Sequence, residues 1–300
     1  MNTASSTPAG AAARVLINSR DRLGECALWC DRDQALYWTD IDSAQLSRWH
    51  ASDGTVTHWQ LDEPLGSFAL SETPGWLLLG LASGAALFDL STGRTGPLLP
   101  VEADEPRTRI NDGRCDPQGR FVFGMFNPHG LAIGGYYRVD GGSREALRIE
   151  RLPLPDAVVG NSLSFSPDGR TLYYTDSPQR RIWALDYHPD GRLGERRVHV
   201  QLAETDGEPD GAAIDSEGGL WSSLWGAGAV ARFDTQGRET HRLPLPASQP
   251  TCPVFGGQAL DRLFVTTARK FCEHEPLAGA VFELDPQGHR GLPPHRFELS

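Results

Sequence analysis

Residues 207–234 read GEPDGAAIDSEGGLWSSLWGAGAVARFD and predict three short β-strands joined by tight turns. Asp210 lies ten residues before the apolar segment LWSSL at 220–224, and a turn with two glycines separates them. The segment AVARFD then alternates in polarity, which is typical of a half-buried antiparallel strand. Such a unit cannot bury its apolar faces alone, so the fold depends on how often the unit recurs.

The unit recurs six times, and the first residues of its apolar segments are 41, 44, 51, 48 and 43 positions apart. These segments are LYWTD (36–40), LLLGL (77–81), FVFGM (121–125), LYYTD (172–176), LWSSL (220–224) and LFVTT (263–267). Each is followed by a segment of roughly alternating polarity that ends in a turn, and no part of the chain has sustained helical periodicity. Six repeats of several short strands predict an all-β fold, a six-bladed β-propeller with a central channel.

One domain is predicted over residues 14–300, because every repeat would pack against two neighbours in a ring. The strand RVLIN (14–18) and the terminal HRFELS (295–300) have no complete blade of their own. They are expected to complete one blade jointly and so close the ring. Residues 1–13 are small and polar and are expected to form a disordered tail.

The composition argues against several kinds of partner. The 300 residues include 28 basic and 39 acidic side chains, for a net charge of −11, and no run is rich in Lys and Arg. Nucleic acid and anionic membrane surfaces are therefore not expected to bind. No segment approaches the ~18 apolar residues of a membrane span, and the N-terminus lacks the features of a secretory signal. Five cysteines without a CxxC pattern favour reduced thiols and a cytoplasmic location.

Four polar residues occupy the same phase of different repeats. Glu25, Asn111, Asn161 and Asp210 each lie 10 or 11 residues before the apolar segment of their own repeat, and Arg109 lies two residues before Asn111 in RTRINDGRCD. Equivalent positions of different blades meet around the propeller axis, so we expect these side chains to converge at one mouth of the channel. The loops that lead into the innermost strands are expected to carry them.

The residue types at this phase favour a hard divalent cation. Glu25, Asn161 and Asp210 would supply carboxylate and amide oxygens without sulfur or imidazole, which suits Ca²⁺, Mg²⁺ or Mn²⁺ better than Zn²⁺. Taken singly, each has a simpler interpretation: Glu25 as a solvated loop residue, and Asn161 and Asp210 as turn residues. Arg109 could pair with a surface carboxylate, and Asn111 begins an Asn-Asp-Gly sequence that reads as a plain turn.

Other motifs give no catalytic signal. The nine histidines are scattered without the spacing of a zinc site, and no GxSxG sequence or glycine-rich phosphate loop is present. The tryptophans are expected to pack between blades, although Trp225 follows an inner strand and is a candidate for the pocket wall.

Five separated segments resemble the gluconolactonase/regucalcin (senescence marker protein 30) family in order and spacing. They are LGECALWCDRDQALYWTDI (23–41), RINDGRCDPQGRFVFGM (109–125), GNSLSFSPDGRTLYYTDS (160–177), EPDGAAIDSEGGLWSSLWGAGAVARFD (208–234) and QPTCPVFGGQALDRLFVTTA (249–268). The resemblance implies a six-bladed propeller that holds one divalent cation and hydrolyses sugar lactones to aldonic acids.

The resemblance also implies roles for individual residues. Glu25, Asn161 and Asp210 match the metal ligands of the family, and Arg109 and Asn111 match positions that contact the substrate. Many relatives carry a glutamate shortly after the third-repeat strand, where this chain reads GMFNPHG (124–130), and Asn127 is the substrate-contact candidate there.

A metal-dependent sugar lactonase is therefore the predicted function, with a small sugar lactone as the partner and a monomer or weak homo-oligomer as the expected state. The segments SQPTCP (248–253) and GLPPHRF (291–297) resemble bacterial lactonases of pentose and galactose oxidation, which favours L-arabinonolactone or galactonolactone beside gluconolactone. The cation would polarise the lactone carbonyl, and either Asp210 or the cation itself would activate the attacking water. The alternatives are a non-catalytic calcium-binding propeller and a metal-dependent esterase or phosphotriesterase.

Overall fold

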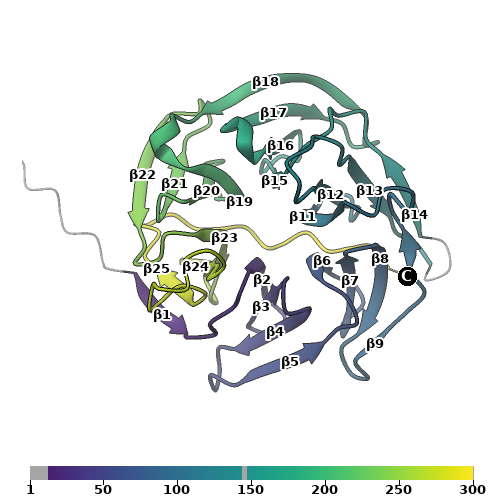
Figure 1. The fold of residues 1–300 in the computed structure, drawn as a ribbon, viewed down its shortest axis with the longest axis horizontal. Helices are drawn as coiled ribbons and strands as arrows, with labels where there is room; N and C mark the ends of the chain where they lie inside the picture. The colour runs from purple at the N-terminus through teal and green to yellow at the C-terminus, as the bar shows by residue number, and fades with distance from the viewer. Residues whose placement is uncertain (1–12, 144–146, 300) are drawn as a thin grey trace, which may run out of the picture.

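The computed structural model describes residues 13–143 and 147–299, which form six antiparallel sheets arranged around a central axis (Figure 1). The first blade contains β2 (Gly24–Cys30), β3 (Ala35–Asp40), β4 (Gln45–His50) and β5 (Val56–Gln60). The second contains β6 (Leu65–Leu70), β7 (Trp76–Leu81), β8 (Gly84–Asp89), β9 (Arg94–Thr95) and β10 (Leu99–Pro100). The third contains β11 (Arg109–Cys115), β12 (Phe121–Phe126), β13 (Tyr136–Asp140) and β14 (Arg148–Arg151).

The remaining blades complete the ring. The fourth contains β15 (Gly160–Phe165), β16 (Thr171–Asp176), β17 (Arg181–Tyr187) and β18 (Leu193–Gln201). The fifth contains β19 (Glu208–Ile214), β20 (Leu220–Trp225), β21 (Ala229–Phe233) and β22 (Glu239–Pro244). The sixth contains β23 (Pro250–Gly256), β24 (Arg262–Thr267), β25 (Val281–Leu284) and β1 (Arg14–Ile17). Two short 3-10 helices, η1 (Ser177–Gln179) and η2 (Glu204–Asp206), lie in connections of the described chain. The six-bladed, all-β prediction is thus confirmed.

The first strand of each blade lies innermost. Strands β2, β6, β11, β15, β19 and β23 contact one another around the axis, as Figure 1 shows. The apolar segments seen in the sequence form the second strands, and the fourth strands are largely exposed, as in β18. The alternation of the outer strands therefore reflects one face against the core and one face in water.

Each interface between neighbouring blades has its own apolar core. Between the first and second blades, Cys26, Leu28 and Tyr37 pack with Phe68 and Phe88, and five equivalent clusters fill the other interfaces. The ring is therefore stabilised by contacts between blades, and a single blade would leave both of its faces exposed.

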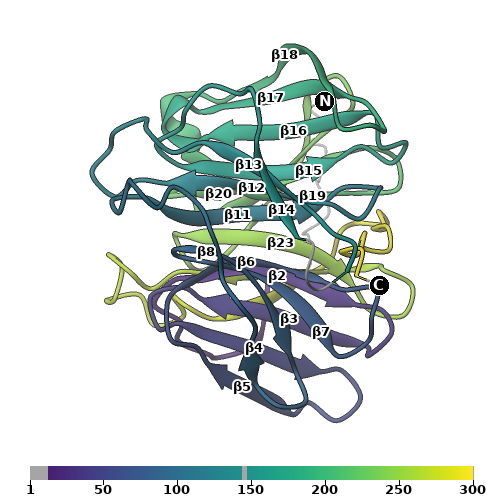
Figure 2. The same ribbon diagram turned by 90° about the vertical axis from the view of Figure 1, so that its right-hand side faces the viewer.

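Only one end of the chain completes the sixth blade, so the expectation of a joint closure is wrong in part. Strand β1 pairs with β25, with Val15 opposite Phe282. The C-terminal segment leaves that sheet and crosses the ring to the second and third blades, where Phe297 bridges to Ser71. Figure 2 shows this segment on one face of the ring and the loop between β24 and β25 on the opposite face.

The disordered tail was predicted over residues 1–13. Residues 1–12 lie outside the described residues, and Ala13 is packed against the core beside the sixth blade, so the prediction does not hold for Ala13. In the described ranges, neither short helix has the length or apolar character of a membrane span.

Candidate functional site

The predicted site residues lie within the innermost strands, at the point where each strand slips in register against its neighbour, and not in the loops before them. The shift follows Glu25 in β2 and Asn161 in β15, and it includes Asn111 in β11 and Asp210 in β19. A β-bulge of this kind bends the strand and redirects a side chain. Four blades therefore present a polar side chain toward the axis at one level.

Two of these bulges hold a residue in the left-handed backbone region. Cys26 follows Glu25 with φ 47°, and Ser162 follows Asn161 with φ 56°. Non-glycine residues adopt this conformation at a cost of about 1–2 kcal/mol, and such residues occur often at functional sites. Ser162 Oγ is in turn hydrogen-bonded to the backbone oxygen of Asp210 at 2.5 Å, which connects the bulges of the fourth and fifth blades.

A cavity of about 350 Å³ opens where these strands meet. It is lined by Leu23, Glu25, Arg109, Asn111, Phe126, Pro128, Val159, Asn161, Ser177, Glu208, Asp210, Trp225, Lys270 and Phe271. Five of the six residues singled out from the sequence thus share one cavity, and Trp225 forms part of its wall.

A chain of hydrogen bonds orders the amides of the cavity. Arg109 Nη1 donates to Asn111 Oδ1 at 2.7 Å, and Asn111 Nδ2 donates to Asn161 Oδ1 at 3.1 Å. Asn161 Nδ2 donates to Ser177 Oγ at 3.0 Å, and Ser177 donates onward to the carbonyl oxygen of Pro209 at 2.7 Å. The donors of the two amides are thus directed toward protein acceptors, which orients both side chains.

The carboxylates of the cavity destabilise one another's charge. Burial raises the pKa of Glu25 to about 8, and the negative charge of Asp112 adds to the effect. Burial likewise raises the pKa of Asp210 well above its usual range, reinforced by Glu25 and then Asp112. Arg109 is removed from water as well, so its pKa falls to about 10 despite the nearby carboxylates. A charge cluster of this kind favours binding of a cation.

The local sequence gave no sign of the role of Asp112. Its carboxylate is buried and accepts a hydrogen bond from the backbone nitrogen of Leu163 at 2.8 Å, which joins the third and fourth blades. In the sequence it belongs to an Asn-Asp-Gly turn pattern, but in the structure these residues lie in the middle of β11. Its contact with the next blade is not visible in any local sequence pattern.

The donor set suits a hard divalent cation. It combines the carboxylates of Glu25 and Asp210 with the amide oxygen of Asn161, and such oxygens are the usual ligands of Ca²⁺ and Mg²⁺. Among the described residues, neither carboxylate has a basic partner within 4.0 Å. The same ranges contain no group of three His, Cys, Asp or Glu side chains arranged as a metal centre, so a site here depends on the asparagine.

Asn127 is not brought into the cavity. Its Oδ1 accepts hydrogen bonds from the backbone nitrogens of His129 (2.8 Å) and Leu131 (3.4 Å), and its Nδ2 donates to the carbonyl oxygen of Arg107 at 3.4 Å. The side chain is buried, and its polar atoms hold the loop after β12 in shape. The neighbouring Pro128 lines the cavity instead.

Of the side chains at the mouth of the cavity, the sequence predicted Trp225 alone, and the repeat phase could not reveal the others. Phe126 and Trp225 end second strands, whereas Lys270 and Phe271 belong to the loop after β24. The Arg109 guanidinium lies over the Phe126 ring, 4.5 Å from its centroid, so the aromatic wall also positions this arginine.

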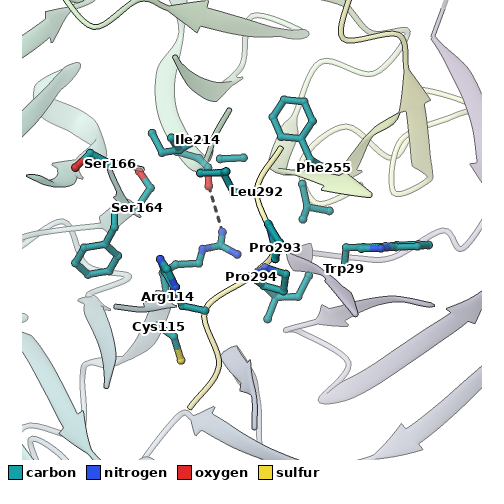
Figure 3. A pocket seen from close by; sticks show the side chains of 16 residues that line it. Trp29, Arg114, Cys115, Ser164, Ser166, Ile214, Phe255, Leu292, Pro293 and Pro294 are labelled. Carbon is teal, nitrogen blue, oxygen red and sulfur yellow. Dashed lines mark hydrogen bonds between the residues drawn. The ribbon is translucent and has the colours of Figure 1, made fainter. Parts of the chain in front are cut away.

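The opposite end of the axis holds a smaller cavity of about 100 Å³ (Figure 3). Arg114 points across it and donates to the carbonyl oxygen of Ala212 at 3.2 Å. Leu292, Pro293 and Pro294 of the C-terminal segment run over this cavity. The mouth of the larger cavity, which holds Glu25 and Asp210, therefore lies on the face that the C-terminal segment does not cross.

Fold and cavity together define a six-bladed propeller with an oxygen-rich pocket on its axis. Residues 23–269 match the family model described as SMP-30/Gluconolactonase/LRE-like region, and the chain belongs to this family. The resemblance found in the sequence is thereby confirmed.

Three relatives show how the chain stands within the family. It is 43% identical to the L-arabinolactonase of Azospirillum brasilense over 298 residues, which cover 97% of this chain and 96% of that protein. It is 37% identical to the 6-deoxy-6-sulfogluconolactonase of Pseudomonas putida over 279 residues, covering 90% and 93%. The crystal structure of a calcium-binding protein, regucalcin, from Agrobacterium tumefaciens strain C58 matches with a TM-score of 0.87 at 30% identity, covering 95% of this chain and 98% of that chain.

Proposed function

We propose that this protein is a cation-dependent sugar lactonase, which hydrolyses an aldonolactone to the aldonic acid. The observation that carries the proposal is the convergence of Glu25, Asn161 and Asp210 with Arg109 and Asn111 in one cavity on the axis. Membership of the family and 43% identity to an L-arabinolactonase along nearly the whole chain support sugar lactone hydrolysis as the reaction.

The relatives favour a five-carbon lactone of the L-arabinonolactone type as the substrate. A cavity of about 350 Å³ lies at the small end of the usual range for ligand sites, which suits a single sugar ring. A lactone that carries an anionic group at C6 is the second choice, because the relative at 37% identity is named for such a substrate.

Glu25, Asn161 and Asp210 are proposed to hold the divalent cation, with Ca²⁺, Mg²⁺ and Mn²⁺ as the candidates. When bound, the cation would act as a Lewis acid toward the lactone carbonyl. Asp210 is proposed to accept the proton of the attacking water, since a carboxylate in a buried site can serve as a general base. Arg109 and Asn111 are proposed to hydrogen-bond to the oxygens of the lactone and so restrict its orientation.

The test measures base uptake after addition of freshly prepared lactones to the purified protein. The panel consists of L-arabinonolactone, galactonolactone, gluconolactone, an aryl ester and a phosphotriester. Each is measured with native cation, after exhaustive chelation, and after return of Ca²⁺, Mg²⁺ or Mn²⁺. We expect hydrolysis of the sugar lactones, highest for the five-carbon ring, with loss on chelation and recovery with one of the cations. Turnover of the aryl ester or phosphotriester in preference to every lactone would reject the proposal.

A second candidate function is a non-catalytic calcium-binding propeller, which the likeness to the calcium-binding regucalcin of Agrobacterium tumefaciens favours. Calorimetry distinguishes the two functions. The binding module predicts tight Ca²⁺ binding without lactone hydrolysis by any metal form, whereas the lactonase predicts both.

The five cysteines of the chain are all buried and unpaired. Free thiols are typical of a reducing compartment, which supports our proposal that the protein works in the cytoplasm. A single chain completes the ring, and the oligomeric state stays a prediction of monomer or weak homo-oligomer.

A further inference from the structure

Phe271 combines three features that are unusual for a large apolar side chain. Its ring lines the mouth of the cavity, and 76% of the residue is nevertheless exposed. The other large hydrophobic residues exposed among the described residues reach at most 48%, at Val198. Its backbone has φ 69°, the left-handed region that bulky residues adopt only at a cost.

The surrounding loop holds Phe271 in this position. Before it, the backbone nitrogen of Lys270 donates to the carbonyl oxygen of Arg22 at 2.9 Å, and Lys270 Nζ pairs with Asp42 Oδ2 at 2.8 Å. After it, Cys272 is buried and its backbone nitrogen donates to the carbonyl oxygen of Arg269 at 3.0 Å. The residues on both sides are anchored to the rest of the fold, so the ring is held outward over the mouth.

The other aromatic groups of the cavity are less available to a ligand. The guanidinium of Arg109 lies over the ring of Phe126. Trp225 ends β20 and is half-buried beside Leu23 and Ile41. Among the residues that the structure describes, the one charged group over the Phe271 ring is the Lys270 ammonium, 5.7 Å from its centroid. Among the described residues, Phe271 is therefore the most exposed large hydrophobic residue of the cavity wall.

We propose that Phe271 is a specificity-determining residue that covers the outer face of the bound lactone ring. The inference deepens the proposed function and rests on it. The C–H face of a sugar ring is apolar and packs on aromatic rings, and such contact would remove Phe271 from water on binding. The aldonic acid product is an open chain without a flat ring, so it gains less from the same contact. Phe271 thereby favours the cyclic substrate over the product that it must release.

Two variants distinguish the effect of the aromatic ring from the effect of the left-handed backbone. Phe271→Gly removes the ring and relieves the cost of the left-handed backbone, whereas Phe271→Ala removes the ring and keeps that cost. Val198→Ala is the matched control, because Val198 is also exposed but lies on the outer strand β18. The measurements are KM and kcat for the best lactone, the inhibition constant of its aldonate product, and the melting temperature.

We expect KM to rise about 5- to 20-fold in both Phe271 variants, with kcat within about twofold of the wild type. The inhibition constant of the aldonate should change less than about twofold. The glycine variant should melt no lower than the wild type, which excludes misfolding as the cause. The control should match the wild type in every kinetic constant.

The results that would overturn the inference are distinct from those that would overturn the proposed function. If both Phe271 variants hydrolysed the lactone with the KM of the wild type, the proposed role of the aromatic ring would be rejected. The proposed lactonase function would not be affected. An equal loss of affinity for lactone and aldonate would show that the ring does not discriminate between them. Absence of any lactone hydrolysis by the wild type would reject the proposed function and this inference together.

Discussion

At the residue scale, the chemistry of the site comes from oxygen donors that repel one another. Glu25 and Asp210 approach from the first and fifth blades, and burial raises the pKa of both. Their convergence in one cavity could be predicted from the sequence, because repeat phase and donor type were both visible. The presence of Asp112 beside them could not be predicted, because it depends on the contact of Asp112 with Leu163 of the next blade. No local sequence pattern indicates this contact.

Replacement of Asp210 by asparagine tests the proposed base. Asp210→Asn keeps an oxygen donor but removes both the charge and the ability to accept a proton. We expect kcat/KM for the best lactone to fall by about 10²- to 10⁴-fold at saturating cation, with an unchanged circular dichroism spectrum. Asp62→Asn, on an exposed loop, is the control and should retain full activity. Near wild-type hydrolysis by metal-replete Asp210→Asn would refute the assignment.

Asp21, which does not line the cavity, makes the stability of the protein depend on pH. It is 5% exposed and accepts a hydrogen bond from Trp38 Nε1 at 2.9 Å, and burial raises its pKa to about 7. Between the usual value of 3.8 and about 7, the folded protein keeps a proton on Asp21 that the unfolded chain has released. The folded state binds more protons in this window, so the stabilisation is complete below the window and is lost as the pH rises through it.

Asp21→Asn should therefore flatten this part of the pH profile. The amide oxygen can still accept from Trp38, but the side chain no longer titrates. We expect the difference in unfolding free energy between pH 5 and pH 8 to shrink by roughly 2 kcal/mol relative to the wild type, measured by urea denaturation. Asp62→Asn serves again as the control. Parallel pH profiles for Asp21→Asn and wild type would show that Asp21 ionises equally in both states.

At the element scale, the innermost strands pack so closely that side chains are excluded at some positions. Gly66 of β6 faces β11, and a Cβ atom there would lie 2.1 Å from the carbonyl oxygen of Ile110 and 3.0 Å from that of Asn111. The strands themselves were evident from the apolar segments and turns. Their bulges were not, because a bulge depends on how neighbouring strands meet at the axis. For this reason the site residues were expected in loops before the inner strands, although they lie within those strands.

Gly66→Ala should damage both the fold and the site. The obstructing atoms belong to the backbone of β11 and cannot move without shifting Asn111. We expect a loss of about 2–4 kcal/mol of unfolding free energy in urea, and a lower kcat/KM even though Gly66 does not line the cavity. Gly96→Ala is the control: a Cβ atom there would lie 3.4 Å from its nearest neighbour, the carbonyl oxygen of Leu87, and the φ of Gly96 lies outside the left-handed region. Equal stability of the two variants would contradict the close packing of β6 and β11.

At the scale of the whole molecule, the two ends of the chain pack against different blades of the propeller. The six-fold repeat predicted the closed ring, and β1 joins the sixth blade as expected. The alternating HRFELS also reads as a strand, yet β1 already occupies the free edge of β25. A local pattern cannot show which edge is free. The segment instead begins near Asp215 of the fifth blade, which bridges to Gly291, and ends between the second and third blades.

Phe297 anchors the far end of the C-terminal segment. Its replacement tests whether this segment stabilises the propeller. Its ring is fully buried in the core between the second and third blades, and its backbone nitrogen donates to the carbonyl oxygen of Leu70 at 2.7 Å. Phe297→Ala leaves a cavity in that core, so we expect a loss of about 3–5 kcal/mol of unfolding free energy, measured by urea denaturation with fluorescence and circular dichroism.

The matched control for Phe297→Ala lies in the same segment. Leu292→Ala changes a residue that is 39% exposed and should cost less than about 1 kcal/mol. If the segment connects the blades, the two probes should report one coincident transition in the wild type and in Leu292→Ala. Equal, small losses in both variants would mean that the segment lies on the ring without stabilising it. β1 and the contacts between blades would then close the propeller by themselves.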